Sequence, residues 1–325
     1  MEKNNQPKDR LKLLAEVAEM YYLNNLTQAQ IARHIGVTRS MISRMLAESR
    51  NKGIVKISIF YPESIDEKLS NLFSEKFRLS ESRIFTSTSI VENEIIDKSG
   101  KIAADFIKPH LSPNIKVGIA WGKALSAAVD ALEFSEPIPI KLVQLVGALG
   151  SKNLGFDGYS LVQKLTSKIG GEGFNLNAPY IVESPVMAEQ LRKTSGIKEA
   201  LELGKECDLA LLGIGTTNID YATFFKAAYL SREEMESLSK AGAVGNVCGL
   251  FFDVNGNPAG KEWQDRSISI KKNDLIHIPK RIAIASGIWK APAILGAIRG
   301  GYINSLVTDS LTAKEILRLE ENQPF

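Results

Sequence analysis

The chain has 325 residues, of which 44% are hydrophobic and 24% are charged, a composition that suits a folded core and excludes a disordered protein. Its length favours two domains over one. The N-terminus is polar, no run of 18 apolar residues occurs, and the two cysteines lie far apart without metal-ligand spacing. We therefore expect a cytoplasmic protein without a membrane span, disulfide framework or zinc site.

The net charge of +3 is unevenly distributed along the chain. Residues 1–56 hold ten Lys or Arg and five Asp or Glu, a balance of +5, so the remainder carries −2. Such a basic segment is typical of a nucleic-acid-binding domain. On charge alone, a solvated basic face without a partner explains the pattern equally well.

The basic segment contains three predicted helices. The first spans residues 11–23, where apolar residues recur at helical spacing. The second spans residues 28–35, with Thr27 as its N-cap, and Thr38 is placed to cap the third. This order of helices and short turns predicts a helix-turn-helix motif. The apolar residues assigned to the first helix are Leu11, Leu14, Ala15, Ala18, Tyr21 and Tyr22.

The third helix has two faces with different expected roles. At about 100° per residue, one face carries the predicted core residues. The opposite face is short, polar and basic, and so is suited to the major groove of DNA, while Arg39 at the first turn is in reach of a phosphate. The core residues are Ile42, Met45, Leu46 and Ser49, and the expected DNA contacts are Gln28, Thr38, Arg39, Ser40, Ser43 and Arg44.

The alternating segment IVKISIF, residues 54–60, predicts a strand that ends this unit as a wing or a link. We place a winged-helix-like DNA-binding domain in residues 1–60 and an α/β ligand-binding domain in residues 61–325. In the second domain, strands and helices alternate, which predicts a mainly parallel sheet with helices packed on it. The strands are expected near residues 83–86, 115–119, 142–145, 209–212, 281–285 and 303–307, and the helices at 94–108, 159–169, 231–240, 292–299 and 312–319.

Four loops that follow predicted strands are rich in Gly and small residues. Ligands of open α/β sheets bind beyond the carboxyl ends of the strands, and we expect each loop to lead into a helix whose free N–H groups favour an anion. Lys123 and Lys290 add positive charge to these loops. An ordinary turn explains any single loop, but the convergence of four favours a ligand site. The loops are residues 118–125, 146–152, 213–217 and 285–290.

The motifs of nucleotide cofactors and of catalysis are weak or missing. GIGTTN has Asn218 where the third glycine of a dinucleotide fingerprint belongs, and no phosphate-binding P-loop sequence occurs. His34, His110 and His277 stand in contexts more typical of structural histidines, and no G-x-S-x-G or H-E-x-x-H motif is present. We therefore predict no cofactor, no metal and no catalytic residue.

Six sequence blocks, spread over nearly the whole chain, together carry a family resemblance. The first is LLAEVAEMYYLNNLTQAQIARHIGVTRSMISRMLAESRNKGIVKISI, and the others are VGIAWGKAL, LVQLVGALG, DLALLGIG, AVGNVCGLFFDVNGNP and GGYINSLVTDSLTAKEIL. In this order they resemble the SorC family of sugar-responsive bacterial transcription regulators, the first block its DNA-binding module and the others successive blocks of its effector domain. The resemblance implies a Rossmann-like C-terminal domain similar to sugar-phosphate isomerases and CoA-transferases, operator binding as a homodimer or homotetramer, and a sugar, polyol or sugar-phosphate effector.

The resemblance also implies a set of effector contacts, in which Lys290 matches a family lysine that binds the anionic group of the effector. Val146 stands where one branch has a lysine that forms a Schiff base, which excludes covalent capture there. Asn246 and Leu250 replace a frequent Asp and Arg, so we expect a ligand that is less phosphorylated or differently oriented than in better-known branches. The expected contacts are Trp121, Gly122, Lys123, Gly147, Gly150, Gly213, Gly215, Thr216, Asn246, Asp253 and Lys290.

Two alternatives to a DNA-binding regulator remain open. The α/β domain with phosphate-friendly loops also suits an isomerase or deaminase of sugar phosphates that carries an N-terminal adaptor. The N-terminal helices could instead contact protein, as in sigma-like factors. The regulator is preferred over the enzyme because the loops lack an acid/base pair and the positive charge is concentrated at the front of the chain.

Overall fold

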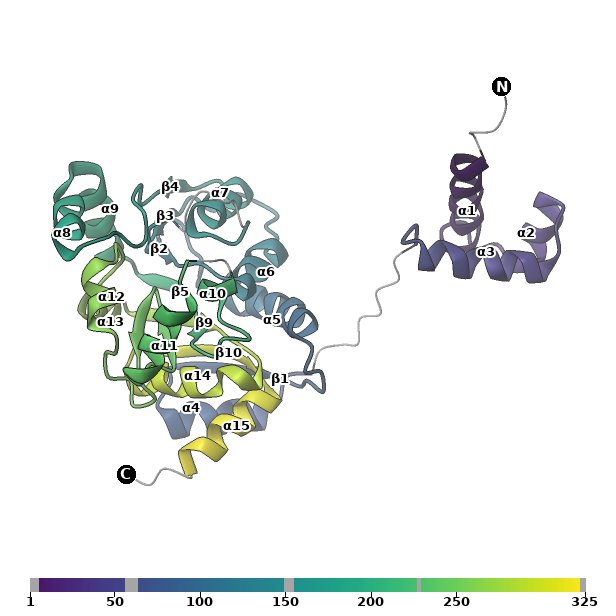
Figure 1. Ribbon diagram of the computed structural model, residues 1–325. Helices are drawn as coiled ribbons and strands as arrows, with labels where there is room; N and C mark the ends of the chain where they lie inside the picture. The colour runs from purple at the N-terminus through teal and green to yellow at the C-terminus, as the bar shows by residue number, and fades with distance from the viewer. Residues whose placement is uncertain (1–5, 56–63, 149–154, 227–228, 322–325) are drawn as a thin grey trace. The chain divides into compact units, whose positions relative to one another are not determined.

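The computed structural model describes residues 6–55, 64–148, 155–226 and 229–321, and the chain divides into two compact units, residues 1–62 and 63–325 (Figure 1). The boundary predicted after residue 60 lies in the segment that joins them. Apart from its first two residues, the strand predicted over residues 54–60 lies outside the described ranges. Among the helices of these ranges, none combines the length and apolarity needed to cross a membrane.

The first unit consists of helices α1 (Gln6–Tyr22), α2 (Gln28–Ile35) and α3 (Arg39–Asn51). A capping box of Thr27 and Gln30 begins α2, and Gly36 in the left-handed conformation ends it. The Thr38 hydroxyl accepts a hydrogen bond from the Met41 amide and so begins α3. The caps lie where the sequence places them because both are local patterns that span no more than four residues.

The core of the helical unit confirms the predicted buried face of α3 and corrects that of α1. Leu11 is 44% exposed and Ala15 is exposed, whereas Val17 is fully buried. The buried stripe of α1 is displaced because residues 14, 17 and 18 share the face that packs on α3. Arg10 on α1 also forms a 2.7 Å ion pair with Glu48 on α3. The buried residues are Leu14, Val17, Ala18, Ile31, Ala32, Ile42, Met45, Leu46 and Ser49.

The second unit is built on a seven-stranded sheet with the order β1-β10-β9-β5-β2-β3-β4, in which every pairing is parallel. This confirms the mainly parallel sheet. From β2 the chain proceeds outward to β3 and β4, whereas from β5 it proceeds to β9 and β10 in the other direction. The order therefore reverses between β2 and β5. The strands are β1 (Glu81–Phe85), β2 (Lys116–Ile119), β3 (Lys141–Gln144), β4 (Glu172–Phe174), β5 (Leu209–Gly213), β9 (Lys280–Ile284) and β10 (Ser305–Asp309).

Helices cover both faces of this sheet (Figure 1). Along β5, Leu209 and Leu211 belong to one core, while Ala210 and Leu212 belong to the other. A strand buried on both faces is apolar at consecutive positions, which explains the continuous LALL sequence. One face packs against α5 (Glu92–Ile107), α6 (Lys123–Ala131) and α7 (Gly158–Ile169), and the other against α4 (Glu67–Phe77), α11 (Arg232–Lys240), α14 (Ala291–Arg299) and α15 (Ser310–Glu321).

Short elements that the sequence pattern did not predict complete the unit. The loop at residues 213–217 leads into a small antiparallel sheet and not into a helix, which corrects the expectation for that loop. Most of these elements have too few residues to show a periodic pattern. They are β6 (Gly215–Thr216), β7 (Gly245–Val247), β8 (Leu250–Phe252), α8 (Pro185–Lys193), α9 (Ser195–Lys205), α10 (Thr223–Lys226), α12 (Lys261–Arg266), α13 (Lys272–His277), η1 (Lys108–His110) and η2 (Ile288–Lys290).

Candidate functional site

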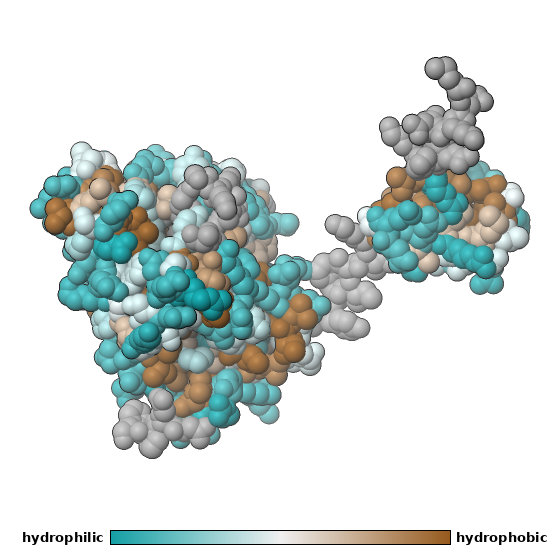
Figure 2. Space-filling model, in the orientation of Figure 1, coloured by the Kyte–Doolittle hydropathy of each residue, from teal (hydrophilic) through white to brown (hydrophobic). Residues whose placement is uncertain are grey.

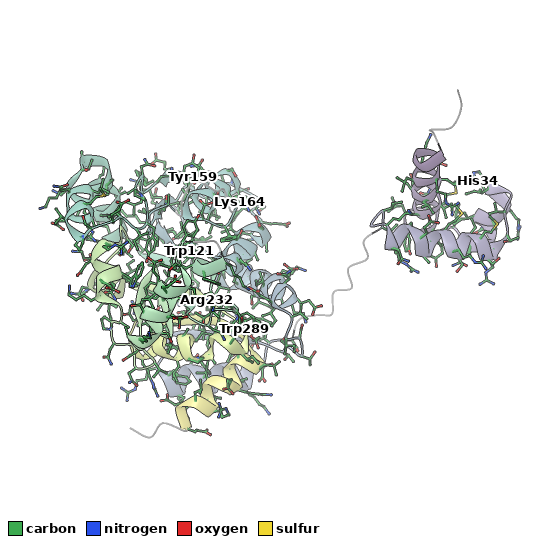
Figure 3. The ribbon with its side chains drawn as sticks, in the orientation of Figure 1. His34, Trp121, Tyr159, Lys164, Arg232 and Trp289 are labelled. Atoms are coloured by element: carbon green, nitrogen blue, oxygen red, sulfur yellow. The ribbon has the colours of Figure 1, made fainter. Side chains whose placement is uncertain are left out.

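A cavity lies beyond the carboxyl ends of β2, β5 and β9, where the strand order reverses. Trp121 follows β2, Gly213 ends β5, and Ser286 follows β9, and all three line the cavity. The first turn of α6, the first two turns of α5 and the η2 segment supply further walls. Figure 3 labels Trp121 and Trp289, the two tryptophans of the lining. Crevices at this position are where open α/β sheets bind their ligands.

The structure brings together eight of the residues predicted to contact the ligand and separates two. Gly147 packs against the backbone of Ala178 and Pro179, where a Cβ atom would lie 2.8 Å from either carbonyl oxygen. The Asp253 carboxylate accepts hydrogen bonds from the amides of residues 255 and 257 within a turn. Gly147 and Asp253 lie outside the lining and Gly150 lies outside the described residues, so contact of these three with an effector stays a prediction. The eight are Trp121, Gly122, Lys123, Gly213, Gly215, Thr216, Asn246 and Lys290.

Positive charge gathers at one end of the cavity. Glu92, the carboxylate among the described lining residues, lies 3.1 Å from Lys123 Nζ through Oε1 and 3.9 Å from Lys226 Nζ through Oε2. Burial lowers the pKa of Lys290 to about 8, while Glu92 raises this pKa and Lys123 lowers it. Lys123 and Lys290 belong to the lining, whereas Lys226 is exposed and lies outside it. Because these lysines outnumber the one glutamate, this end of the cavity attracts anions.

The start of helix α6 adds to this preference for an anion. Gly122 is the N-cap of α6 and supplies no side-chain cap to its first turn. Uncapped first-turn N–H groups and the positive end of the helix dipole both favour negative charge. The first turn of α6, residues 123–125, lines the cavity directly.

Aromatic side chains form the other walls. Tyr221 stacks on Trp289, with ring centroids 4.1 Å apart and planes 9° apart, and Trp121 meets Phe224 edge-on at 4.8 Å. The indole N–H of Trp289 is buried and has no partner among the described residues. Apolar walls with a few fixed polar groups are typical of small-molecule sites.

The loop that carries Trp289 and Lys290 is held by buried hydrogen bonds. The Gly287 amide donates to Asp309 Oδ2 at 2.9 Å and to Thr312 Oγ1 at 2.8 Å. Gly287 has φ 105°, and a Cβ atom there would lie 2.4 Å from the Trp289 ring, so only glycine fits. Buried hydrogen bonds of this kind fix the position of Lys290 before any ligand arrives.

The sequence pattern did not reveal Glu92, Tyr221 or Trp289 as members of the site. Trp289 stands beside the predicted Lys290 in SGIWK, and the aromatic-rich segment YATFF at residues 221–225 was a usable signal. Glu92 had no such signal. It begins a helix that follows a different strand, and the fold alone brings it to the lysines.

The helical unit offers a second candidate surface on α3. Ser40, Ser43 and Arg44 are exposed on the side opposite the buried stripe, and Arg39 is exposed at the first turn. Thr38 uses its hydroxyl as the cap of α3. Gln28, the first residue of α2, is half-buried. Of the six predicted residues, four thus present exposed polar or basic side chains on α3 itself, and Thr38 and Gln28 flank them.

Groups that could serve redox or metal chemistry are sparse in the described ranges. Burial raises the pKa of both free thiols, Cys207 and Cys248, to about 12, which makes them unreactive. Across those same ranges no three His, Cys, Asp or Glu side chains are grouped to hold a metal ion. His34 is exposed in the helical unit, His277 contacts the Asn273 carbonyl through Nδ1, and His110 lies 3.6 Å from Glu81 (Figure 3 labels His34).

Comparisons with known proteins agree on a family. The family described as "Putative sugar-binding domain" matches residues 63–318. The chain is 30% identical to the sorbitol operon regulator of Klebsiella pneumoniae over 95% of this chain and 99% of that protein, and 26% identical to the deoxyribonucleoside regulator of Bacillus subtilis over 95% and 98%. The crystal structure of full-length SorC from K. pneumoniae matches with a TM-score of 0.72, 30% identity, and coverage of 95% of this chain and 99% of that one. This chain therefore belongs to the SorC family of sugar-responsive transcriptional regulators.

Proposed function

We propose that the chain controls a carbohydrate catabolic operon by binding operator DNA, and that a sugar, polyol or phosphorylated sugar in the cavity sets its operator affinity. The observation that carries the proposal is the cavity itself. It joins Lys123, Lys290, the uncapped start of α6 and stacked aromatic rings at the point where the strand order reverses. Such a site suits a small molecule with an anionic end and an apolar or hydroxylated body.

In this proposal α1, α2 and α3 act as a winged-helix-like helix-turn-helix domain, and α3 enters the major groove. Its exposed Ser43 and Arg44 offer donors to base edges, and Arg39 reaches a phosphate. Thr38 and Gln28 lie at helix starts, where backbone N–H groups also contact phosphates. The basic balance of residues 1–56 supports this assignment.

We assign the α/β unit to the Rossmann-like fold of sugar-phosphate isomerases and CoA-transferases, used for binding and not for turnover. Within the described lining, Glu92 is the carboxylate, it is paired with lysine, and the lining holds no histidine. Isomerisation of a sugar phosphate needs a free general base for the carbon-bound proton and an acid or electrophile at the carbonyl oxygen. The ion pair of Glu92 leaves the site without this arrangement, which disfavours an isomerase or deaminase.

The regulator acts in the cytoplasm as a homodimer or homotetramer. Two copies of α3 then meet half-sites about one helical turn apart, and effector binding changes how well the pair spans them. A ligand controls this equilibrium only as far as its affinities for the two arrangements differ. The coupling expected for such proteins changes operator affinity by roughly 5- to 150-fold.

The test is DNA binding by the full chain, measured by fluorescence anisotropy at fixed salt. The DNA probes are fragments from upstream of its own gene and of neighbouring genes, with and without a panel of sugars, polyols and their phosphates. We expect one fragment to bind specifically and one ligand class to shift its Kd by at least about fivefold. Turnover of a sugar phosphate without any DNA binding would favour the enzyme instead, and protein contacts without DNA binding would favour a sigma-like role.

A further inference from the structure

Glu92 occupies the position where a ligand's anionic group would be expected. It stands at the first turn of α5, and its two oxygens point to lysines from two other elements, Lys123 on α6 and Lys226 on α10. Its side chain is only 29% exposed, and it also lines the cavity. A carboxylate of the protein itself thus partly neutralises the charge of these lysines.

This arrangement has a clear electrostatic reason. Removing lysine ammonium groups from water is costly unless a negative charge lies nearby. Burial lowers the pKa of Lys290, and the nearby Glu92 carboxylate raises it, which favours the charged form of the lysine. Glu92 is therefore the carboxylate that offsets the positive charge of Lys123, Lys226 and Lys290.

We propose that Glu92 is an internal competitor of the effector, which must take Lys123 and Lys226 from it in order to bind. This inference rests on the proposed function of the cavity. A ligand with a single negative charge would replace one carboxylate by another and gain little Coulomb energy. A phosphomonoester carries close to two negative charges and offers three acceptor oxygens, so it outcompetes Glu92. The effector class selected in this way is a sugar or polyol with one phosphate group, and sugar acids and neutral sugars are rejected.

Displacement of Glu92 from Lys226 should also affect the aromatic wall of the cavity. The Lys226 ammonium lies 5.4 Å from the centre of the Tyr221 ring, and Tyr221 stacks on Trp289. When Lys226 leaves Glu92, the ion pair that joins α5 to α10 opens beside this stack. Binding of the anion should therefore change the fluorescence of Trp289 together with the pairing of Glu92.

The experiment measures binding of inorganic phosphate and of acetate to the full chain by calorimetry and tryptophan fluorescence. In Glu92→Gln the amide keeps the shape of the side chain but gives up the competing charge. We expect phosphate to bind this variant about tenfold more tightly than it binds the wild type, and acetate to bind the variant alone. Glu94→Gln removes the same charge two residues away, from an exposed position outside the lining, and should match the wild type.

Several outcomes would overturn the inference. Equal or weaker phosphate binding by Glu92→Gln would show that Glu92 contacts the ligand or has no part in binding. If Glu94→Gln gains as much phosphate affinity as Glu92→Gln, the gain comes from the overall charge of the protein and not from the position of Glu92. If Glu92→Gln does not fold, Glu92→Asp decides, because it retracts the carboxylate from the lysines and should bind phosphate more tightly than the wild type. Operator control by a sugar or polyol, measured separately, shows whether the proposed function survives when this inference fails.

Discussion

The two candidate sites of this protein both suit anions but present their positive charges in opposite ways. On α3, Arg39 and Arg44 are exposed on the helix surface, so their guanidinium groups stay hydrated. In the cavity, Lys123 and Lys290 are half-buried and share Glu92. Figure 2 shows that the visible surface of both units mixes hydrophilic and hydrophobic residues, so surface hydropathy does not separate the two kinds of site.

The difference lies in what each site must do before its partner arrives. An exposed guanidinium costs nothing to maintain and gains most of its binding energy by releasing counterions from DNA. An enclosed lysine is expensive to maintain charged, so it needs a resident carboxylate, and its ligand has to displace that carboxylate. The DNA site should therefore depend strongly on salt, and the cavity should depend on pH and on the charge of its ligand.

Replacing Lys290 with Met should produce the largest effect. It removes a fixed, partly dehydrated cation from the anion end of the cavity, and we expect a loss of about 1.5–3 kcal/mol in phosphate affinity, or roughly 10- to 150-fold. Because burial lowers the pKa of this lysine to about 8, the variant should be at least as stable as the wild type at neutral pH. Calorimetric titration and thermal unfolding of the same samples measure both quantities.

Lys314→Met is the matched control, since Lys314 is exposed on α15 and lies outside the lining. It should bind phosphate like the wild type. If Lys290→Met binds phosphate as tightly as the wild type, Lys290 does not belong to the anion site. A large fall in the unfolding temperature of this variant would show that the lysine stabilises the fold.

Replacing Arg44 with Ala tests the exposed site. If this guanidinium contacts a base edge, the variant should lose about 1–3 kcal/mol of operator affinity while its binding to unrelated DNA changes little. The ratio of the two affinities at one salt concentration is the quantity to measure. Unchanged discrimination would show that Arg44 lies away from the base edges.

Arg39→Ala on the same helix supplies the contrast for Arg44. A phosphate contact carries no sequence information, so this variant should weaken binding to every DNA alike and reduce the slope of log K against log salt by about 1. If the two arginine variants behave identically, α3 does not present separate reading and phosphate-binding positions.

The pH dependence of phosphate binding should set the cavity apart from α3. The folded-state pKa of Lys290 is about 8, below its ordinary 10.5. Just below pH 8 the lysine is mostly charged and phosphate is mostly the dianion, so binding is strongest there. Above pH 8 the free site must take up a proton to bind, and the affinity should fall by up to about tenfold per pH unit. Lys290→Arg, which stays charged, should show a flatter profile between pH 8 and 10.5.

The lowered pKa of Lys290 also affects the free energy of unfolding. Between pH 8 and 10.5 the unfolded chain binds more protons at this residue than the folded chain, so the contribution of Lys290 to stability rises with pH through that window. Thermal unfolding of the wild type against Lys290→Met across that range isolates this contribution. A contribution that fell with pH would contradict a desolvated Lys290.

What the sequence predicts well in this protein is periodic or local. The buried face of α3 and the caps at Thr27 and Thr38 follow from short patterns and are found where the patterns place them. The six predicted strands lie within about two residues of the observed ones, whereas the three-residue β4 was not predicted. The cavity depends on contacts between distant segments. Glu92 and Lys226 are 134 positions apart (226 − 92) and meet through the order of the strands, which no local pattern contains. Gly147 and Asp253, which the resemblance assigns to the effector site, lie outside the lining and make local contacts, so their role in binding stays a prediction.

The smallest predicted effect concerns Thr38, which the sequence assigns both to a helix cap and to DNA contact. Its hydroxyl accepts a hydrogen bond from the Met41 amide at 3.3 Å and lies 3.0 Å from the Ser40 hydroxyl. Thr38→Ala should cost the helical unit about 1 kcal/mol of stability, and Thr38→Ser should retain the cap. If capping is its whole role, the Ser variant binds operator DNA like the wild type, and the Ala variant loses affinity only as far as α3 frays. A loss of operator affinity in Thr38→Ser at unchanged stability would instead place the threonine methyl group at the DNA, because the two side chains differ only in that methyl group.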